Sequence, residues 1–413
     1  MAQVQEFRAE EVGTGRYLAL ALLCAAISLA CVAIPMFVIR PFRPQGTQEL
    51  NLALAVRHIG PWLSGISAVV VLLLLIRLWK AIRIGPKIIL LGLFLLAAAG
   101  AVLTHVNIFE KMFHPYDSPA FASADAVKVD SDDKVLAVKL GQEARAYPIR
   151  TMGYHHIVND TVGGVPIAVT YCTLCHTGLV WSRVIDGKTL HFRLAGINNG
   201  NALLRDEETS SIWQQSTGEA IFGPLKGRQL EMVRNDELSF ALWRSEQPQG
   251  LVLKPDATYE AEYDPKDWES HIAKTRTVVD TTSSGIGPHQ LMLGATVNGQ
   301  SKAYPIETVL AAKMIQDRIE ASPVVVVVGP DGTSIRAFEV GMDAEGSTLR
   351  FAPGEGDAAM RDVQTGSAWN FHGCAVEGSL TGRCLKAIDA HKDYWFDWMN
   401  HHPASAVYKG RAS

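Results

Sequence analysis

Residues beyond about 134 carry one sequence pattern twice, at a nearly constant offset. The string Ala-Tyr-Pro-Ile occurs at 146–149 and again at 303–306, an offset of 157 residues. An offset of 156 matches four further residues, Asp206, Thr209, Ser211 and Trp213, with Asp362, Thr365, Ser367 and Trp369. Trp243 then matches Trp398 at an offset of 155. Such a small drift is typical of duplication with short insertions and deletions. The sequence therefore predicts two related lobes on one scaffold.

Only the first copy carries the string Tyr-Cys-Thr-Leu-Cys-His-Thr-Gly, at 171–178. The offset of 157 pairs its thiols and two upstream imidazoles with residues that lack these groups: Cys172 with Gly329, Cys175 with Gly332, His155 with Ala312 and His156 with Lys313. A pattern shared by both copies indicates scaffold, whereas groups found in one copy are candidates for function. We therefore expect a functional site in the first copy, and expect Asp206, Thr209, Ser211 and Trp213 to be scaffold.

Three long apolar stretches precede the repeat, at about 17–39, 61–79 and 88–106. Each is long enough to cross a hydrocarbon core of about 30 Å. The sequence therefore predicts a membrane region over residues 1–104. A cleaved signal sequence is the alternative for the first stretch, but the stretch is long for that and has no convincing cleavage site.

The charges between these stretches predict the orientation. The short second link is the more densely basic, with Arg77, Lys80, Arg83 and Lys87, whereas the longer first link carries Arg40, Arg43 and Arg57. Because short basic links stay in the cytoplasm, we expect a protein of the cell (inner) membrane with a cytoplasmic N-terminus. The residues after about Thr104 are then extracytoplasmic.

The predicted location sets how the cysteines are interpreted. Disulfides persist outside the cytoplasm. Cys374 and Cys384 occur in the second copy only, opposite Glu219 and Gln229, and we expect them to form a structural disulfide. Cys24 and Cys31 fall in the first apolar stretch and are expected to be inert packing residues.

Strand-like segments dominate the part beyond the membrane region. The fold prediction is a three-helix membrane anchor plus a mainly-β (α+β) extracytoplasmic part made of two related lobes. The expected boundaries are a tether at 105–124, a first lobe at 125–254, a polar linker at 255–290 and a second lobe at 291–413. The net charge is −4 and no Lys/Arg run is present, which argues against a nucleic-acid partner.

A Cys-x-x-Cys at the end of a strand brings two sulfurs together. Cys172 and Cys175 could open and close a disulfide, hold a metal such as zinc or copper with imidazole, or supply a nucleophilic thiolate. The imidazoles that could assist as ligands are His155, His156 and His176. Polar residues that follow in the first copy are candidates for lining the site: Thr177, Asn198, Asn199, Asn201 and Gln215.

Four strings in the first copy resemble the hallmark motifs of the domain-of-unknown-function 3179 family: YHHIVND, TYCTLCHTG, FRLAGINNGNALLRDEETSSIW and TGEAIFGPLKG. The resemblance covers about Lys134 to Leu253, and the second copy resembles a degenerate unit. It implies a bacterial or archaeal domain, often secreted or membrane-bound, with no settled reaction. The family's motif positions correspond to His155, Cys172, Cys175, Thr177, Asp206, Ser211 and Trp213. His176 departs from the family's usual string.

Two classes of function remain open on the sequence. One is a membrane-anchored extracytoplasmic protein with a thiol-based redox or metal-binding site and a redox or protein partner outside the cytoplasm. The other is a non-catalytic binding or scaffold module in which Cys172 and Cys175 form a static disulfide. The joint loss of thiols and imidazoles from the second copy favours the first. A cysteine hydrolase is a weaker third, because its thiol would be exposed to oxidation.

Overall fold

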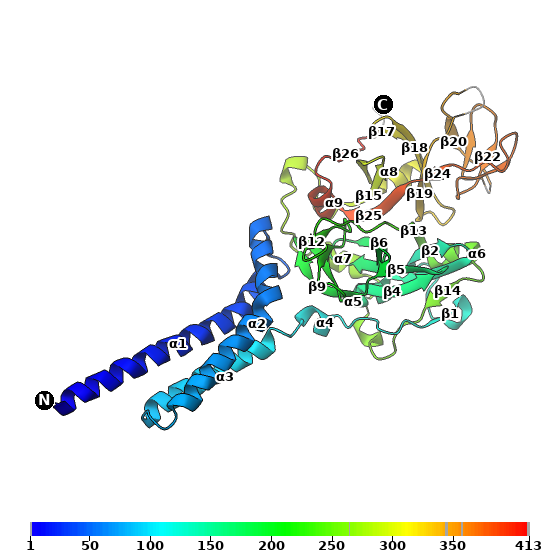
Figure 1. Ribbon diagram of the computed structural model, residues 1–413. Coiled ribbons are helices and arrows are strands. Elements are labelled where there is room, and N and C mark those ends of the chain that lie inside the picture. Colours follow the sequence, from blue (N-terminus) through cyan, green and yellow to red (C-terminus); the bar gives the residue numbers. More distant parts are fainter. Residues whose placement is uncertain (1, 264, 343–345, 357, 411–413) are drawn as a thin grey trace. The chain divides into compact units, whose positions relative to one another are not determined.

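The computed structural model describes residues 2–263, 265–342, 346–356 and 358–410 (Figure 1). The chain forms two compact units. The first holds the N-terminal helices, and the second holds nearly all residues from Phe113 onward.

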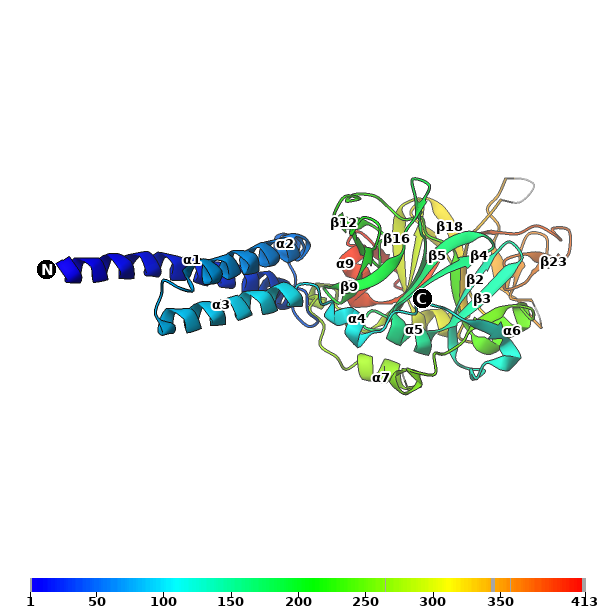
Figure 2. The same cartoon turned by 60° about the horizontal axis from the view of Figure 1, so that its bottom comes forward.

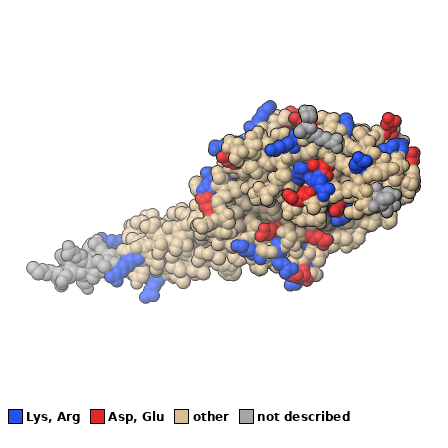
Figure 3. Space-filling view, turned by 90° about the horizontal axis from the view of Figure 1, so that it is seen from above, with Lys and Arg blue, Asp and Glu red and all other residues tan. Residues whose placement is uncertain are grey.

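The first unit contains three helices that are long and apolar enough to cross a membrane, at Thr14–Val38, Thr47–Leu78 and Ile84–Leu103. They belong to α1 (Ala2–Val38), α2 (Thr47–Leu78) and α3 (Ile84–Leu103), and α4 (Ile108–Met112) follows. Three predicted spans are thus confirmed as candidate spans, although α2 begins well before residue 61 because its helix continues through Pro61. On the face drawn in Figure 3, charged side chains are sparse along this unit.

Small residues bring the three helices close together. Gly100 of α3 lies so near α1 that an added Cβ would sit 2.4 Å from Ser28 Oγ. The Ser28 hydroxyl donates a hydrogen bond to the carbonyl of Ala97, at 2.8 Å. Close approach through small residues and interhelical hydrogen bonds are how helices associate in lipid, where the hydrophobic effect supplies little.

The first lobe of the second unit contains three main sheets and two short helices. The five-stranded sheet has the order β1 (Phe121–Ser123), β14 (Leu251–Leu253), β3 (Glu143–Pro148), β2 (Lys134–Leu140) and β13 (Asn235–Ser239). The three-stranded sheet consists of β4 (Ile157–Val162), β5 (Val165–Cys172) and β6 (Thr177–Ser182). The four-stranded sheet has the order β12 (Ala220–Phe222), β11 (Ile212–Gln214), β10 (Asn201–Asp206) and β9 (Phe192–Asn198). A small hairpin and two helices complete the lobe: β7 (Val184–Ile185), β8 (Lys188–Thr189), α5 (Ile149–His155) and α6 (Phe240–Glu246).

The second lobe has a similar succession of elements, but its described residues form no counterpart of the β7–β8 hairpin and add one short strand, at Lys386–Ala387. Its first sheet has the order β25 (Asp389–Tyr394), β15 (Leu291–Val297), β16 (Gln300–Pro305) and β26 (Ala406–Val407). The next has the order β17 (Met314–Ile319), β18 (Ser322–Val328), β19 (Ile335–Glu339) and β24 (Lys386–Ala387). The third has the order β20 (Phe351–Pro353), β21 (Met360–Asp362), β22 (Ala368–Trp369) and β23 (Ala375–Glu377). The helices are α8 (Ile306–Ala312) and α9 (Trp395–His401). The mainly-β fold is therefore as predicted.

Matching residues of the two lobes make matching contacts. The indole N–H of Trp213 donates to Asp206 at 2.8 Å, and that of Trp369 donates to Asp362 at 3.1 Å. Each Asp also accepts from the backbone N–H three residues on, which closes a tight turn. These turns and buried indoles explain why both copies keep these residues, and they agree with the expectation that the residues are scaffold.

The described residues of the stretch at 255–290 include short helices, and one of these packs on the first lobe. It contains η2 (Glu260–Glu262), α7 (Trp268–Ile272) and η3 (Thr282–Ser284). Trp268 is buried and lies edge-on to Tyr171 in the core of the first lobe. The polar composition of this stretch predicted a linker, but one buried indole holds part of it against the lobe.

The two lobes lie against each other within the second unit, with β25 of the second lobe beside β6 of the first (Figures 1 and 2). A buried ion pair joins the lobes, because Lys392 Nζ of β25 donates to Glu237 Oε1 of β13 at 2.8 Å. Burial alone raises the pKa of the Glu237 carboxyl, but the charges of Lys392, His176 and Lys134 outweigh burial and lower that pKa below its usual value.

Candidate functional site

The two thiols of the first lobe occupy the turn of one hairpin. Strand β5 ends at Cys172, which pairs with Thr177 at the start of β6. The Sγ atoms of Cys172 and Cys175 are 2.8 Å apart, and both residues are free cysteines. A disulfide has a sulfur–sulfur distance of about 2.05 Å, so a small movement of either side chain would close the bond. Both are buried, with 4% of Cys172 and 0% of Cys175 exposed.

The carbonyl of Gly200 accepts hydrogen bonds from both thiols. It lies 3.6 Å from Cys172 Sγ and 3.2 Å from Cys175 Sγ. Gly200 has a φ of +99°, and a Cβ at this position would lie 2.8 Å from the ring of Phe396. Glycine is therefore required both by the backbone conformation and by the aromatic ring that α9 of the second lobe places over the turn.

A buried amide network surrounds the sulfurs. The amide nitrogen of Asn201 lies 3.4 Å from Cys175 Sγ and 3.0 Å from the Gln215 side-chain oxygen. Gln215 in turn donates to the hydroxyl of Thr170 and to the carbonyl of Thr177, at 3.1 and 3.2 Å. The structure thus gathers Thr177, Asn201 and Gln215, three of the predicted lining residues, beside the thiols. The other two, Asn198 and Asn199, lie at the half-buried turn that precedes Gly200.

Two carboxyl groups of the second lobe complete this network. The hydroxyl of Thr177 donates to Asp393 Oδ1 at 2.7 Å, and the amide of Asn201 donates to Asp397 Oδ2 at 2.9 Å. The backbone N–H of Tyr394 donates to the carbonyl of Cys175 at 2.8 Å. Asp393 is 2% exposed and Asp397 is fully buried. The candidate site is therefore formed by both lobes.

Burial and charge set the protonation of the site. Burial first, and then the negative charge of Asp397, raise the pKa of Asp393 well above its usual range. Burial, the hydrogen bond with Cys172 and the charge of Asp397 likewise raise the pKa of Cys175 well above that of a free thiol. A neutral Asp393 and a protonated Cys175 are therefore the favoured states near neutral pH.

The three predicted imidazoles have other partners. His155 contacts the carbonyl of His114 at 2.6 Å and the hydroxyl of Tyr263 at 3.1 Å. His156 contacts the carbonyl of Tyr171 at 2.8 Å, and burial lowers its pKa to about 4. His156 ends α5 with a φ of 59°, as Lys313 ends α8 with a φ of 62°. The backbone conformation of His156 thus belongs to the shared scaffold.

His176 faces the stretch between the lobes. Its Nε2 lies 2.6 Å from Glu269 Oε1, and its ring stacks on Trp268 with 5.2 Å between the ring centroids. Burial raises the pKa of Glu269, but the hydrogen bond from His176 and the charges of Lys134 and His176 outweigh burial and lower that pKa to about 2. His176 therefore joins α7 to the hairpin that carries the thiols.

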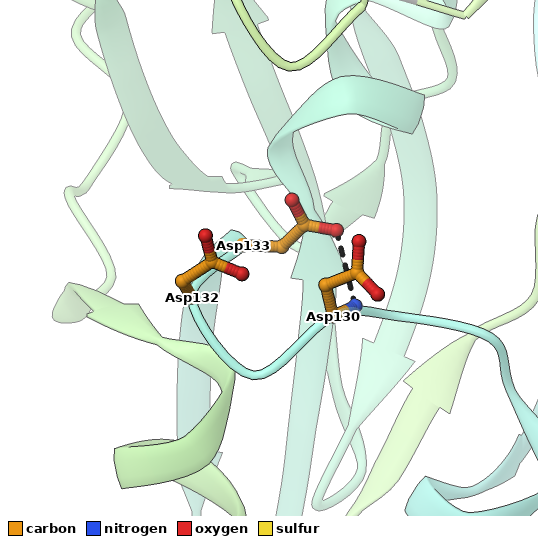
Figure 4. A group of neighbouring side chains, drawn as sticks. All are labelled: Asp130, Asp132 and Asp133. Atoms are coloured by element: carbon orange, nitrogen blue, oxygen red, sulfur yellow. Dashed lines mark hydrogen bonds between the residues drawn. The ribbon is translucent and has the colours of Figure 1, made fainter.

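A metal ion would need three or more ligand atoms close together, within 4.8 Å of one another. Among the described residues, such a group is formed by Asp130, Asp132 and Asp133, and none includes Cys172 or Cys175 (Figure 4). The ammonium group of Lys266 already pairs with Asp130 and Asp132. The acidic group is thus a surface turn whose charge Lys266 balances in part, and zinc or copper at the thiols stays a prediction.

The second lobe carries the disulfide that the sequence predicted. Cys374 and Cys384 are bonded to each other and form a cross-strand bridge. Glu219 and Gln229 form the corresponding bridge in the first lobe without a covalent bond. The disulfide therefore reinforces a contact that the first lobe makes by hydrogen bonding alone.

A second contact between the lobes mirrors the thiol site. The offset of 155 aligns Asp393 with Leu238 and Asp397 with Leu242, both on the β13–α6 segment. The N–H of Ser239 at the end of β13 donates to Ser334, which follows the turn that begins at Gly329, at 3.1 Å. At this reciprocal contact, glycines replace both thiols and leucines replace both carboxyls.

Asp393 and Asp397 were not among the predicted site residues. The prediction considered only groups that the first copy has and the second copy lacks, and these two carboxyls belong to the second copy. A search in the opposite direction finds Asp393 and Asp397, since the aligned residues of the first copy are leucines. Their approach to the thiols depends on contacts across more than 200 residues of sequence, which no local pattern reports.

Fold and site together define a class of protein: three candidate membrane helices followed by a two-lobed, mainly-β unit with a buried dithiol. The chain belongs to the family described as "Protein of unknown function (DUF3179)", whose model matches residues 113–405. This range extends beyond the stretch of resemblance seen in the sequence and includes the second lobe, with Asp393 and Asp397. No curated protein and no solved structure matches the chain.

Proposed function

We propose that this protein is a membrane-anchored, extracytoplasmic thiol redox protein whose Cys172–Cys175 pair alternates between a dithiol and a disulfide. The observation that carries the proposal is the difference between the two contacts that join the lobes. One contact gathers two thiols and two buried carboxyls, and the other has neither, yet both hairpins form.

The polar groups at the thiols are not needed for the fold. Burying a carboxyl group costs free energy unless it is well paired, and the second lobe builds the same hairpin with Gly329 and Gly332 in place of the thiols. Groups that cost stability and are dispensable for the scaffold are typical of functional sites.

A redox role fits the pair better than a metal site does. Among the described residues, no third metal-ligating group joins the two thiols within 4.8 Å. Thiols at 2.8 Å with a shared hydrogen-bond acceptor are arranged for a bond between the sulfurs. Since Cys172 is the more exposed sulfur, we expect it to react first with a disulfide partner.

The proposed location rests on the basic link between the second and third spans. Its Lys and Arg residues favour the cytoplasm, which places the second unit on the opposite side of the membrane. The Cys374–Cys384 disulfide agrees with an oxidising compartment.

Reversible cycling of the full-length protein tests the proposal. The protein in detergent is treated with glutathione disulfide and then with reduced glutathione, and the peptides are alkylated and identified by mass spectrometry. We expect Cys172 and Cys175 to lose and regain reactivity together while Cys374 and Cys384 stay bonded. Metal analysis of the same sample tests the zinc or copper alternative.

A non-catalytic module with a static disulfide is the alternative, and the complete burial of Cys175 is the observation that favours it. This alternative predicts that Cys172 and Cys175 stay bonded to each other in every glutathione mixture that leaves the protein folded. That result, or stoichiometric metal on the thiols, would overturn the redox proposal.

A further inference from the structure

We propose that Asp397 of the second lobe accepts the proton that Cys175 loses when the disulfide with Cys172 closes, and that His401 supplies the positive charge beside Asp397 for this step. The inference rests on the proposed redox function and identifies the base that the reaction needs.

One amide group lies between the thiol and the carboxyl and donates to both. Asn201 Nδ2 lies 3.4 Å from Cys175 Sγ and 2.9 Å from Asp397 Oδ2. The other oxygen, Asp397 Oδ1, is buried and has no hydrogen-bond partner among the residues that the structure describes. Buried carboxylate oxygens are normally hydrogen-bonded, and Asp397 Oδ1 instead has an ion-pair contact with His401 Nδ1, at 3.4 Å.

The two carboxyls have different roles. Burial and the charge of Asp397 raise the pKa of Asp393 well above its usual range, so Asp393 keeps its own proton. Two neighbouring buried carboxyls are not both ionised readily. Asp397 has the nearby cation, because His401 Nδ1 lies 3.4 Å from Asp397 Oδ1. The contact with His401 therefore favours Asp397, rather than Asp393, as the proton acceptor.

His401 is suited to stabilise that charge. Burial alone lowers the pKa of the His401 imidazole, but the charge and hydrogen bonds of Asp397 outweigh burial and raise it. His391 and His402 also interact with Asp397, and burial lowers the pKa of each to about 4, so both are neutral. Among these histidines, only His401 has a raised pKa.

A small disulfide, RSSR, can serve as the oxidant that closes the Cys172–Cys175 bond. Cys172 attacks the oxidant RSSR, forms the mixed disulfide Cys172–S–SR and releases one RSH. The thiol proton of Cys175 passes to the Asp397 carboxylate, and the Cys175 sulfur attacks Cys172 Sγ. The bond between the two cysteines forms, the bond from Cys172 to SR breaks, and RS⁻ takes a proton from solvent. The protein loses two electrons and RSSR gains them.

The reciprocal contact supports this assignment. The alignment pairs Asp397 with Leu242 and His401 with Glu246. Glu246 binds Arg336, with two oxygens at 2.8 Å, and does not take part in any equivalent of the Asp397–His401 pair. The proposed base and its cation are thus absent where the thiols are absent.

The Asp397→Asn variant separates proton acceptance from a general electrostatic effect. Asn at this position can still accept the hydrogen bond from Asn201, but it carries no charge and accepts no proton. Closure is measured as the rate at which Cys175 loses reactivity in glutathione disulfide at pH 7. The acidity of Cys175 is measured separately, from the pH dependence of its alkylation in the reduced protein.

We expect Asp397→Asn to lower the pKa of Cys175, since a negative charge is removed, and yet to slow closure by about tenfold or more, as loss of a general base does. Asp389→Asn, a change at an exposed position of β25, the strand that leads into α9, is the matched control and should leave both values unchanged. His401→Gln keeps the carboxylate, and we expect it to slow closure less than Asp397→Asn does.

The outcomes distinguish this inference from the redox proposal. Closure that is unchanged or faster in Asp397→Asn would overturn Asp397 as the base and leave the redox proposal intact. A wild-type protein that fails to close would overturn the redox proposal itself. If Asp397→Asn does not fold, a closure rate in His401→Gln equal to that of wild type would overturn the role of the pair.

Discussion

The two contacts between the lobes differ in chemistry although they share a scaffold. At one contact, β25 and α9 bring Asp393 and Asp397 to the Cys172–Cys175 turn. At the other, β13 brings Ser239 to Ser334, which follows the turn that begins at Gly329, and the residues aligned with the two carboxyls are Leu238 and Leu242. The comparison shows that the hairpins and their docking need neither thiols nor carboxyls. The polar set at the first contact is therefore best explained by function.

The largest expected effect comes from placing a carboxyl at the contact between the lobes that lacks the thiols. Leu238→Asp puts a charge at a buried position that lacks the hydroxyl of Thr177 and the amide of Asn201. Leaving a buried charge without compensation costs about 3–5 kcal/mol. Chemical denaturation of the variant measures this cost. A loss of stability below about 1 kcal/mol would show that this contact accommodates a buried carboxyl as readily as the contact with the thiols does.

The second prediction compares the two cysteine pairs. Cys374→Ser should lower the free energy of unfolding by about 2–4 kcal/mol, as loss of a disulfide does, and should leave the redox cycle intact. Cys172→Ser should abolish the cycle, with a smaller effect on stability because no covalent bond is lost from the dithiol. Equal and purely stability-related effects would count against chemistry at Cys172.

The third prediction concerns the pH dependence that Asp393 causes. The folded-state pKa of Asp393 is raised well above its usual value of 3.8. Between these two pKa values the folded state binds more protons than the unfolded state, so stability falls as pH rises. Asp393→Asn removes this penalty and can still accept the hydrogen bond from Thr177.

Thermal unfolding of wild type and Asp393→Asn from pH 4 to pH 8 measures the effect. We expect the variant to unfold at the higher temperature, with a difference that grows as pH rises. A difference that is constant with pH would mean that Asp393 is ionised in the folded state, and a lower midpoint for the variant at pH 7 would reverse the interpretation.

Local patterns in the sequence predicted much of this molecule. Apolar length gave three candidate spans, and the expected oxidising compartment predicted the disulfide between Cys374 and Cys384. The position of Cys172 at a strand end was also evident, because the β-branched run before it is typical of a buried strand.

The partners of the thiols were harder to predict, because they depend on docking between lobes. His155 and His156 were close in sequence, but a helix end aims them at the carbonyls of His114 and Tyr171. Asp393 and Asp397 reach the thiols only when β25 packs beside β6. The imidazoles are close to the thiols in sequence, but the carboxyls are the groups that the packing of the lobes places beside them.

The most direct test of the account is a redox titration that follows both cysteine pairs in one sample of the full-length protein. The dithiol of Cys172 and Cys175 donates two hydrogen bonds to Gly200 that a disulfide could not make, which stabilises the reduced form. We therefore predict that this pair titrates at a higher potential than Cys374–Cys384, whose potential should lie below about −300 mV as for other structural disulfides. A single shared midpoint, or a lower potential for Cys172–Cys175, would contradict the account.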